Sequence, residues 1–447
     1  MPPLATSARG SHLDEHTRGE EALTNFTDDQ KVYTTPNGTQ LHGDSLELLE
    51  GLEDESVDLI VTSPPFALQR KKAYGNEDQE AYVDWLAQFG EAAKRVLKPT
   101  GSLVIDIGNA YRKGSPTRAL YPYRVLLKFV DELEYHLAEE FFWYNPAKLP
   151  SPLEWVNKRR IRVKDAVNTI WWFSKTEWPQ ADVNKVLLPY SENMERLLKD
   201  PEKYYKTTLR PSEHAISKHF GNNNGGSIPP NLLHVPNTES NSNYLRLCRE
   251  LSIKSHPARF PAKLPEFFIQ FLTKPGDVVV DIFSGSNTAG MVAEQLGRKW
   301  YSFELSHDYA ALSIMRFLPS MPPETAHKLY QKALQETVAL PDEARHLSQA
   351  ALDAAEAGLD IALEEREAAN QAWGAAADQT HDSKSFDSSE HAEKTLALAK
   401  ERRVAAEKEV KKAKQALTTA QAASAALDAF YAPETVVPNG DTSTEVE

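Results

Sequence analysis

The feature that most constrains the fold is a repeated alternation of short apolar runs with amphipathic stretches. Residues 57–61 predict a buried strand, residues 82–97 carry apolar side chains at helical spacing, and residues 103–107 predict a second strand. One more helix and several more strands follow, at residues 123–133, 140–144, 169–173, 278–280 and 300–303. This alternation predicts an α/β fold with a doubly wound, mainly parallel sheet.

The composition narrows the classes of protein further. A chain of 447 residues can hold two or three domains with a large core. Its single cysteine, Cys248, excludes an intramolecular disulfide and a zinc site built from thiolates, and it indicates a reducing compartment. No apolar run reaches the roughly 18 residues of a membrane span. We therefore expect a cytoplasmic protein without membrane contact and without a metal site.

The charge is distributed unevenly along the chain. The net charge is −14, and most of the excess of acidic residues lies after residue 323. Residues 148–175, in contrast, hold seven basic and two acidic side chains. Such a strip can contact phosphates, or it can be a solvated basic face without a partner.

A rare motif follows the strand predicted at residues 57–61. Pro64 and Pro65 fix the backbone and donate no hydrogen bonds, so that the carbonyls around them keep unused acceptor capacity. Ser63 adds a hydroxyl, and Phe66 offers an aromatic face. Such a rigid turn can hold the exocyclic amine of a flat base extruded from a duplex. The alternative is a strand that two prolines simply end.

A second motif combines a strand, a glycine-containing turn and the start of a helix at residues 278–290. Gly285 permits backbone angles that other residues resist and lets a ligand lie against the main chain. The next strand ends at Glu304, 23 residues after Asp281, where a carboxylate commonly binds ribose hydroxyls. The pair predicts a nucleotide-like cofactor, although any doubly wound sheet can contain a glycine turn.

Together, the two motifs resemble those of the amino-directed DNA methyltransferases that use S-adenosylmethionine. The order, with the base pocket first and the cofactor turn last, is similar to their permuted β group, in which S-P-P-[FY] is associated with cytosine-N4 methylation. Four further stretches, spread over residues 31–320, look like those of PvuII-type cytosine-N4 enzymes: residues 66–72, 145–152, 225–233 and 256–261. The resemblance implies a Rossmann-like methyltransferase sheet in permuted order and double-stranded DNA as the substrate.

The resemblance also implies roles for individual residues. It implies that the methionine and ribose side of the cofactor is held by Asp281, Phe283, Gly285, Ser286, Asn287 and Thr288. It further implies that Glu304 binds the ribose hydroxyls, that Phe260 lies beside the methionine moiety, and that Asp44 lies near the adenine.

The chemistry of an amino group suggests how such a site would act. The amino nitrogen of cytosine is a poor nucleophile because its lone pair is delocalised into the ring. Acceptors on Ser63 and on the carbonyl of Pro64 can hold the two N–H bonds so that the lone pair points at the methyl group. Asp106, at the end of residues 103–107, can orient Ser63 or take up the proton, or it can merely cap a loop.

Other activities remain open to different degrees. Carbon-5 methylation needs a nucleophilic cysteine, whereas Cys248 lies in a stretch that looks like an amphipathic helix and is expected to pack. Methylation of the N6 amino group of adenine is the main alternative, because an amino group is held in the same way on either ring. A DNA- or RNA-binding module without catalysis is the alternative from another class.

The sequence also predicts how the chain divides into functional regions. We expect a mobile arm at residues 1–30, a catalytic half at 31–175, a target-recognition region at 176–255, and a cofactor-binding half at 256–323. The region 176–255 looks like irregular loops, and its candidate base readers, which could equally be plain turn residues, are His214, Lys218, Asn222 to Asn224 and Asn237. The resemblance implies 5'-CAGCTG-3' as the target, with methylation of the inner cytosine, and a cognate endonuclease without a stable complex.

Residues 324–447 are predicted to form a helical extension. Residues 341–373 and 393–430 are rich in Ala, Glu and Lys, with apolar residues three and four apart, so they predict two long helices. The polar break at 374–391 would let them fold into an antiparallel hairpin with a largely alanine seam. The sequence leaves open whether this hairpin packs, self-associates or is dispensable, and it does not fix the oligomeric state.

Overall fold

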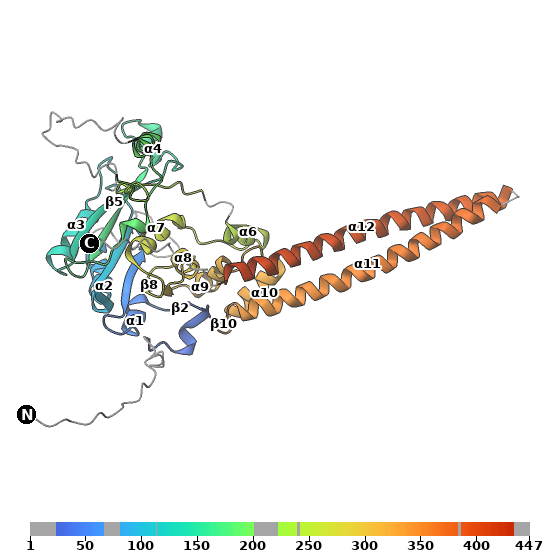
Figure 1. Ribbon diagram of the computed structural model, residues 1–447, viewed down its shortest axis with the longest axis horizontal. Coiled ribbons are helices and arrows are strands. Elements are labelled where there is room, and N and C mark those ends of the chain that lie inside the picture. Colours follow the sequence, from blue (N-terminus) through green and yellow to red (C-terminus); the bar gives the residue numbers. More distant parts are fainter. Residues whose placement is uncertain are drawn as a thin grey trace, which may run out of the picture.

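The computed structural model describes residues 24–66, 81–112, 114–200, 222–238, 242–382 and 386–432. Figure 1 shows a body built on a sheet and, projecting from it, a long pair of helices. The site discussed below lies in the body.

One sheet organises the body, and within the described residues it has ten strands in the order β10-β1-β2-β9-β8-β3-β4-β6-β5-β7. Strands β2, β9, β8, β3 and β4 run parallel, whereas β6 is antiparallel to both β4 and β5. The predicted α/β fold with a mainly parallel sheet is therefore confirmed. The strands are β1 Lys31–Thr34, β2 Gly38–His42, β3 Val57–Thr62, β4 Leu97–Ile107, β5 His136–Tyr144, β6 Val167–Ser174, β7 Leu232–His234, β8 Val278–Asp281, β9 Lys299–Glu304 and β10 Val338–Ala339.

Helices cover both faces of this sheet. Leu59 and Val61 of β3 share one apolar cluster with α7 and α8, while Ile60 shares another with α1, α2 and α3. This division follows from the strand geometry, because successive side chains of a strand point to opposite faces. The helices of the body are α1 Ser45–Glu50, α2 Tyr82–Val96, α3 Tyr121–Asp131, α4 Glu192–Lys199, α6 Asn243–Glu250, α7 Lys263–Leu272, α8 Thr288–Gln295, α9 His307–Leu312 and α10 Pro323–Ala333.

The parallel strands bring the two sequence motifs to one edge. Strand β8 lies between β9 and β3, so the turns after Thr62 and after Asp281 are neighbours. The hydroxyl of Thr62 donates a 2.7 Å hydrogen bond to Oδ1 of Asp281 and joins the two motifs directly. The carboxyl ends of parallel strands are where open α/β sheets bind ligands.

The folded part begins earlier than the sequence predicts. Residues 24–30, assigned above to a mobile arm, belong to the packed structure: Thr24 bridges to Leu52, and the ring of Phe26 lies 5.6 Å from that of Tyr301. The apolar ring of Phe26 explains this, since it also packs against the buried ring of Phe303, a partner that local sequence patterns do not reveal. Residues 1–23 lie outside the described part of the chain.

The region predicted to contain only loops adds to the sheet. Residues 232–234 form β7, which pairs in parallel with β5 at the edge of the sheet. The prediction of loops rather than sheet layers is therefore wrong at this point, because three residues between Pro230 and Pro236 carry too short a pattern to be recognised. Cys248 is buried on α6, as expected for a packing residue.

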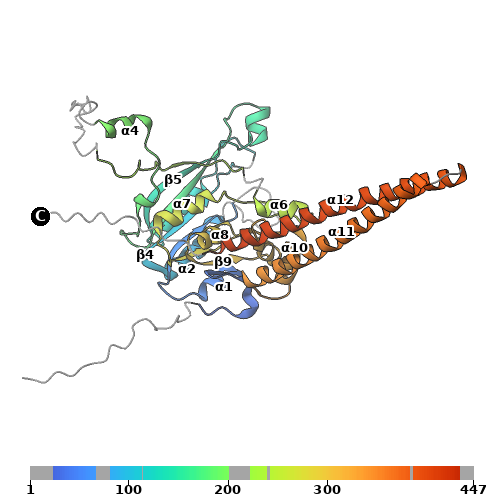
Figure 2. The same ribbon diagram turned by 45° about the vertical axis from the view of Figure 1, so that its right-hand side comes forward.

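The helical hairpin is confirmed, but its helices are longer than predicted. α11 spans Asp342–Asp382 and α12 spans Phe386–Phe430, and Figures 1 and 2 show them side by side. The predicted break at 374–391 is wrong for residues 374–382 and 386–391, because surrounding strong helix formers outweigh the cost of one interior glycine, about 1 kcal/mol. The alanine seam is present, with buried Ala362, Ala376, Ala399 and Ala406.

The base of the hairpin is part of the core. Leu427 is 1% exposed within the same apolar cluster as Phe317, and Phe430 packs against Phe317 with ring centroids 6.2 Å apart. Val338 of β10 pairs with Tyr33, so the predicted boundary at residue 324 does not separate two bodies. In the described ranges, no helix is both long and apolar enough to cross a membrane.

Candidate active site

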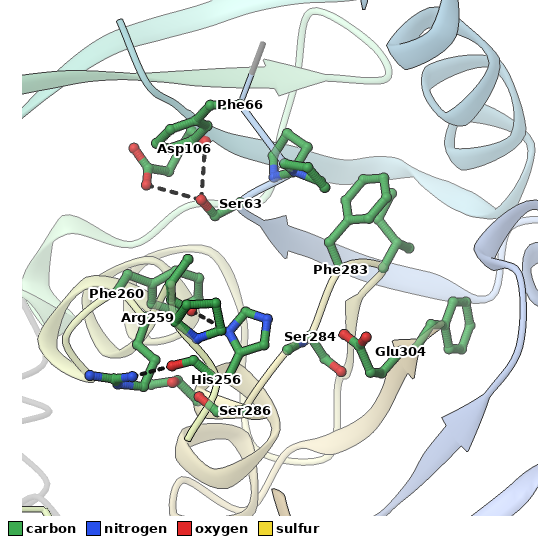
Figure 3. Close-up of a pocket in the computed structure, with 18 of the residues that line it drawn as sticks. Ser63, Phe66, Asp106, His256, Arg259, Phe260, Phe283, Ser284, Ser286 and Glu304 are labelled. Atoms are coloured by element: carbon green, nitrogen blue, oxygen red, sulfur yellow. Dashed lines mark hydrogen bonds between the residues drawn. The ribbon is translucent and has the colours of Figure 1, made fainter. Parts of the chain in front are cut away.

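A cavity of about 500 Å³ opens at the carboxyl edge of the parallel strands. Figure 3 shows side chains from both sequence motifs turned toward it. The predicted site residues that line it are Asp44, Ser63, Pro64, Pro65, Phe66, Asp106, Phe260, Phe283, Gly285, Ser286, Thr288 and Glu304. Asp281 and Asn287 lie behind this lining.

Ser63 and Asp106 form a hydrogen-bonded pair in the cavity wall. Strands β3 and β4 are parallel neighbours, so the residues after β3 lie beside the last residues of β4. The hydroxyl of Ser63 donates to Oδ2 of Asp106 over 3.2 Å (Figure 3). The sequence-based expectation that Asp106 can orient Ser63 therefore has the required geometry.

Asn168, which the sequence analysis missed, holds the other oxygen of Asp106. Its Nδ2 donates to Oδ1 of Asp106 over 3.1 Å from the adjacent strand β6. Asn168 and Asp106 are only 8% and 7% exposed. The sequence does contain a signal for Asn168. A side-chain amide among β-branched and aromatic strand residues is expected to be buried, and a buried amide needs a hydrogen-bond partner.

The environment of Asp106 changes its protonation. Burial raises the pKa of Asp106 to about 6, while the hydrogen bonds from Asn168 and Ser63 and the charge of Lys148 act in the opposite direction. Above that pH the carboxylate is ionised and can accept the Ser63 proton more strongly. A carboxyl poised near neutrality is the usual form of a general base.

Phe66 depends on a neighbouring glycine for its place in the wall. A Cβ added to Gly108 would lie 2.2 Å from the Phe66 ring, so only glycine permits this close packing. The ring therefore lies directly over the end of β4, close to Asp106 (Figure 3). Residues 67–72, part of the stretch that carries the resemblance, are outside the described ranges.

The turn after β8 has the tight geometry that its glycine predicted. Gly285 has a φ of +54°, and a Cβ there would lie 2.9 Å from the His256 ring. Asn287 also has a positive φ, of 54°, and its Oδ1 accepts from the amide of Gly290 at the start of α8. Its Nδ2 donates to the hydroxyl of Tyr33. Asn287 is fully buried and shapes the turn, and the cofactor contact that the resemblance implies for it stays a prediction.

Asp281 is a buried carboxylate with an unsatisfied oxygen. It is 1% exposed, and its Oδ1 accepts from Thr62 and, over 3.1 Å, from the amide of Phe283. Oδ2 has no hydrogen-bond partner among the described residues. Burial raises the pKa of Asp281 to about 7, the two hydrogen bonds oppose this, and the charge of Glu304 adds to it. An orphaned carboxylate oxygen behind the cavity fits a ligand that brings donors or positive charge.

Glu304 and Asp44 present carboxylates on the side of β9. Glu304 accepts from the amides of Gly285 and Ser306, each over 2.9 Å, and burial raises its pKa. Each carboxylate oxygen still has a free lone pair, so the side chain can accept further hydrogen bonds. Asp44 is exposed at the cavity rim and caps α1 by accepting from the amide of Leu46.

An aromatic wall closes one side of the cavity. Phe89 and Trp85 of α2 pack against Phe283, with ring centroids 4.9 and 5.7 Å apart. The sequence analysis predicted a helix at residues 82–97 but did not single out Phe89 or Trp85, because helical spacing alone does not distinguish a core ring from one that faces a ligand. The wall fits a flat, apolar ring.

Arg316 holds the turn from behind. Its Nε donates to the carbonyl of Ser286 over 2.6 Å and its Nη2 to the hydroxyl over 2.8 Å. The guanidinium lies 5.0 Å from the ring of Tyr244, whose hydroxyl accepts from the amide of His256. Nothing in the sequence predicts this long-range support.

The predicted base readers are distributed unevenly. His214 and Lys218 lie outside the described ranges. Asn222, Asn223 and Asn224 are exposed. Asn237 lines the cavity instead, and its Nδ2 donates to the carbonyl of Arg259 over 3.0 Å.

We predict that Asp281→Asn stabilises the fold in a pH-dependent manner. A carboxyl whose pKa is higher in the folded chain stabilises it below the unfolded pKa and loses that contribution as the pH rises through about 7. Asn cannot ionise, so the variant should gain at most about 4 kcal/mol of unfolding free energy at pH 8 and clearly less at pH 5. Urea unfolding at both pH values measures this gain. Equal gains at pH 5 and pH 8 would contradict the assigned pKa.

The parallel sheet and the cavity that joins the two motifs define the class of protein. The chain belongs to the N6/N4 family of DNA methylases, whose model matches residues 57–315. A solved structure, the PvuII DNA methyltransferase (cytosine-N4-specific), superposes with a TM-score of 0.58 at 51% identity and covers 71% of this chain and 99% of its own. The methyltransferase fold implied by the resemblance is therefore confirmed.

Two relatives differ widely in their sequence identity to this chain. The chain is 56% identical to the type II methyltransferase M.PvuII of Proteus hauseri over 323 residues, which are 72% of this chain and 96% of the relative. It is 25% identical to the DNA adenine methyltransferase YhdJ of Escherichia coli (strain K12), over 62% of this chain and 82% of that protein.

Proposed function

We propose that this protein transfers a methyl group from S-adenosylmethionine to the N4 amino group of cytosine in duplex DNA. The observation that carries the proposal is the Ser63–Asp106 hydrogen bond, which lies in the same cavity as the Gly285 turn. A polar pair that can hold an amine and a glycine turn that admits a cofactor are the two parts that direct methyl transfer requires. The similarity to M.PvuII supports cytosine over adenine.

When bound, the cofactor would supply a methyl carbon as the electrophile, and its sulfonium sulfur would leave as a neutral thioether as the C–S bond breaks. The chain has to supply orientation and acceptors. Ser63 and the carbonyl of Pro64 accept from the two N–H groups of cytosine and localise the nitrogen lone pair. As the new N–C bond forms, the nitrogen becomes cationic and acidic. Its proton passes through the Ser63 hydroxyl to Asp106, or it passes to water. No covalent intermediate with the protein is needed.

The cofactor-facing residues fall into three groups. Glu304 is proposed to accept from the ribose hydroxyls, and Asp44 to lie near the adenine. The aromatic wall with Phe283 is proposed to hold the adenine ring. Gly285, Ser286, Thr288 and Phe260 are proposed to line the methionine side, while Asp281 and Asn287 fix the turn from behind.

The target sequence is proposed to be 5'-CAGCTG-3', with the inner cytosine methylated. Its support is the 56% identity to M.PvuII. Residues 176–255 are proposed to read the bases, and the enzyme is proposed to act in the cytoplasm, protecting host DNA from a cognate endonuclease without a stable complex.

Single-molecule sequencing of DNA from cells that express the protein tests these proposals. It reads the modified atom and the surrounding motif together. Cytosine-N4 marks in CAGCTG are expected. Cytosine-N4 marks in another motif would keep the reaction and refute the target, whereas N6-methyladenine would identify the adenine alternative. The absence of marks would favour a binding module without catalysis.

A further inference from the structure

An apolar and basic projection lies at the mouth of the cavity. Residues 148–164 connect β5 to β6 and include a short helical turn, Glu154–Lys158; we call them the β5–β6 projection. In Figure 2 this projection is the teal helical turn that stands out from the sheet. Its first residue, Lys148, lines the cavity together with Asn145.

The projection exposes large apolar side chains. Leu149 is 80% exposed and Val163 is 84% exposed. Leu153 and Ile161 are more than half exposed as well. Such side chains are normally buried, and their concentration in one short segment marks an interaction surface.

Leu149 and Val163 belong to the two stems of the projection. Nζ of Lys164 donates to the carbonyls of Pro146 and Lys148, over 3.1 and 3.2 Å, and so joins the stems. Leu149 follows Lys148 in the chain and Val163 precedes Lys164. The two apolar side chains therefore flank the junction that lies next to the cavity.

The stems are held by further contacts. The amide of Asp165 donates to the carbonyl of Ser151 over 3.2 Å, and the carboxylate of Asp165 pairs with Arg118 over 2.9 Å. Arg162 donates to the carbonyl of Pro116 and lies over the ring of Tyr111. Leu149 and Val163 are thus presented on a supported framework, which lowers the entropy cost of binding.

The charge of the projection suits a polyanion. Residues 148–164 contain six basic side chains and one acidic one, Glu154, which pairs with Lys158 and Arg159. Arg160 is exposed and has a φ of 55°, a conformation that costs free energy for a residue other than glycine. Cations around an apolar centre match a duplex, whose phosphates surround stacked bases.

We propose that Leu149 and Val163 form a wedge that enters duplex DNA beside the target and fills the space left when the base rotates into the cavity. The inference rests on the proposed function, because a base must leave the helix to reach Ser63 and Asp106. The occupant of the surface is duplex DNA. Arg160 and its basic neighbours contact the flanking phosphates.

Single-turnover methyl transfer with the full chain tests the wedge. The double variant Leu149→Ala/Val163→Ala is compared with the wild type on two duplexes that contain CAGCTG. One is fully paired, and the other has an abasic site opposite the target cytosine, which makes extrusion easier. We expect the variant to lose roughly tenfold in rate on the paired duplex and to be within about twofold of the wild type on the abasic one.

Ile361→Ala on α11 is the matched control, because Ile361 is 58% exposed and is remote from the cavity lining. It should transfer at the wild-type rate on both duplexes. Arg160→Ala should weaken binding equally on both, with a smaller salt dependence. Unchanged melting temperatures confirm that the variants fold.

Each outcome decides for or against the wedge. An equal loss of rate on both duplexes would assign Leu149 and Val163 to general DNA binding and overturn the wedge. No loss on either duplex would make the surface a site for another partner and overturn it as well. Wild-type protein that methylates neither duplex would refute the proposed target or the proposed reaction, a result distinct from a failure of the wedge alone.

Discussion

Ser63→Ala should lower the rate of methyl transfer by about 10²- to 10³-fold while leaving the affinity for S-adenosylmethionine unchanged. The hydroxyl of Ser63 faces the cavity and bonds Asp106, whereas the cofactor turn lies across the cavity after β8. Removing the hydroxyl takes away an acceptor for the amine and the hydrogen bond that Ser63 donates to Oδ2 of Asp106, while Asn168 still donates to Oδ1. Single-turnover kinetics measures the transfer step, and a calorimetric titration measures cofactor binding.

A surface serine provides the control for this variant. Ser115 is outside the cavity lining, and its Oγ bonds only locally, to Thr117. Ser115→Ala should transfer at the wild-type rate. Equal losses of rate and of cofactor affinity in Ser63→Ala would show that Ser63 supports the cavity as a whole and does not act on the amine.

The second large effect concerns pH. Because the pKa of Asp106 is about 6, the carboxylate is ionised above pH 6 and protonated below it. If the ionised form accepts from Ser63, the rate of methyl transfer should fall about tenfold for each pH unit well below 6. Asp106→Asn should be slower by about 10²-fold or more at pH 8, and its rate should no longer depend on pH in this range.

The titration of Asp281 could produce a similar dependence of the rate on pH, because its pKa is about 7 and it lies next to the cofactor turn. The rates should therefore be measured with saturating cofactor in single turnovers, so that binding does not contribute. A wild-type rate that stays constant from pH 5 to pH 8 would refute the role of Asp106. A drop that persists in Asp106→Asn would assign it to another group.

Much of the fold could be predicted because the pattern is local. Runs such as residues 57–61 and the helical spacing of residues 82–97 each fit one kind of element, and their alternation fits few architectures. The edge of the sheet and the start of the folded part were harder to predict. Strand β7 is too short to show a period, and Phe26 packs against Tyr301, almost the whole length of the body away in sequence.

The site shows the same limit. Ser63, Asp106 and Gly285 were predictable, because they stand at the ends of predicted strands and their side chains or backbone have few structural uses there. Asn168 lies on β6 and Arg316 in the short 3-10 helix Ser313–Phe317, and only the tertiary fold brings them to Asp106 and Ser286. For Asn287 a turn residue and a ligand contact look alike in sequence, and its contact with the cofactor stays a prediction.

Because the base of the hairpin is anchored in the core, the folded catalytic unit includes residues beyond the predicted boundary at residue 324. The chain leaves the body after β10, runs out and back, and returns Phe430 and Tyr431 to the core, where Tyr431 donates to the carbonyl of Phe317. In topological terms the hairpin is an insertion into the body. The residues after it, Phe430 and Tyr431, complete the core of the catalytic unit. Truncating the chain at residue 324 would leave a hole beside Phe317, whereas removing matched lengths from α11 and α12 would shorten the arm and keep the unit closed.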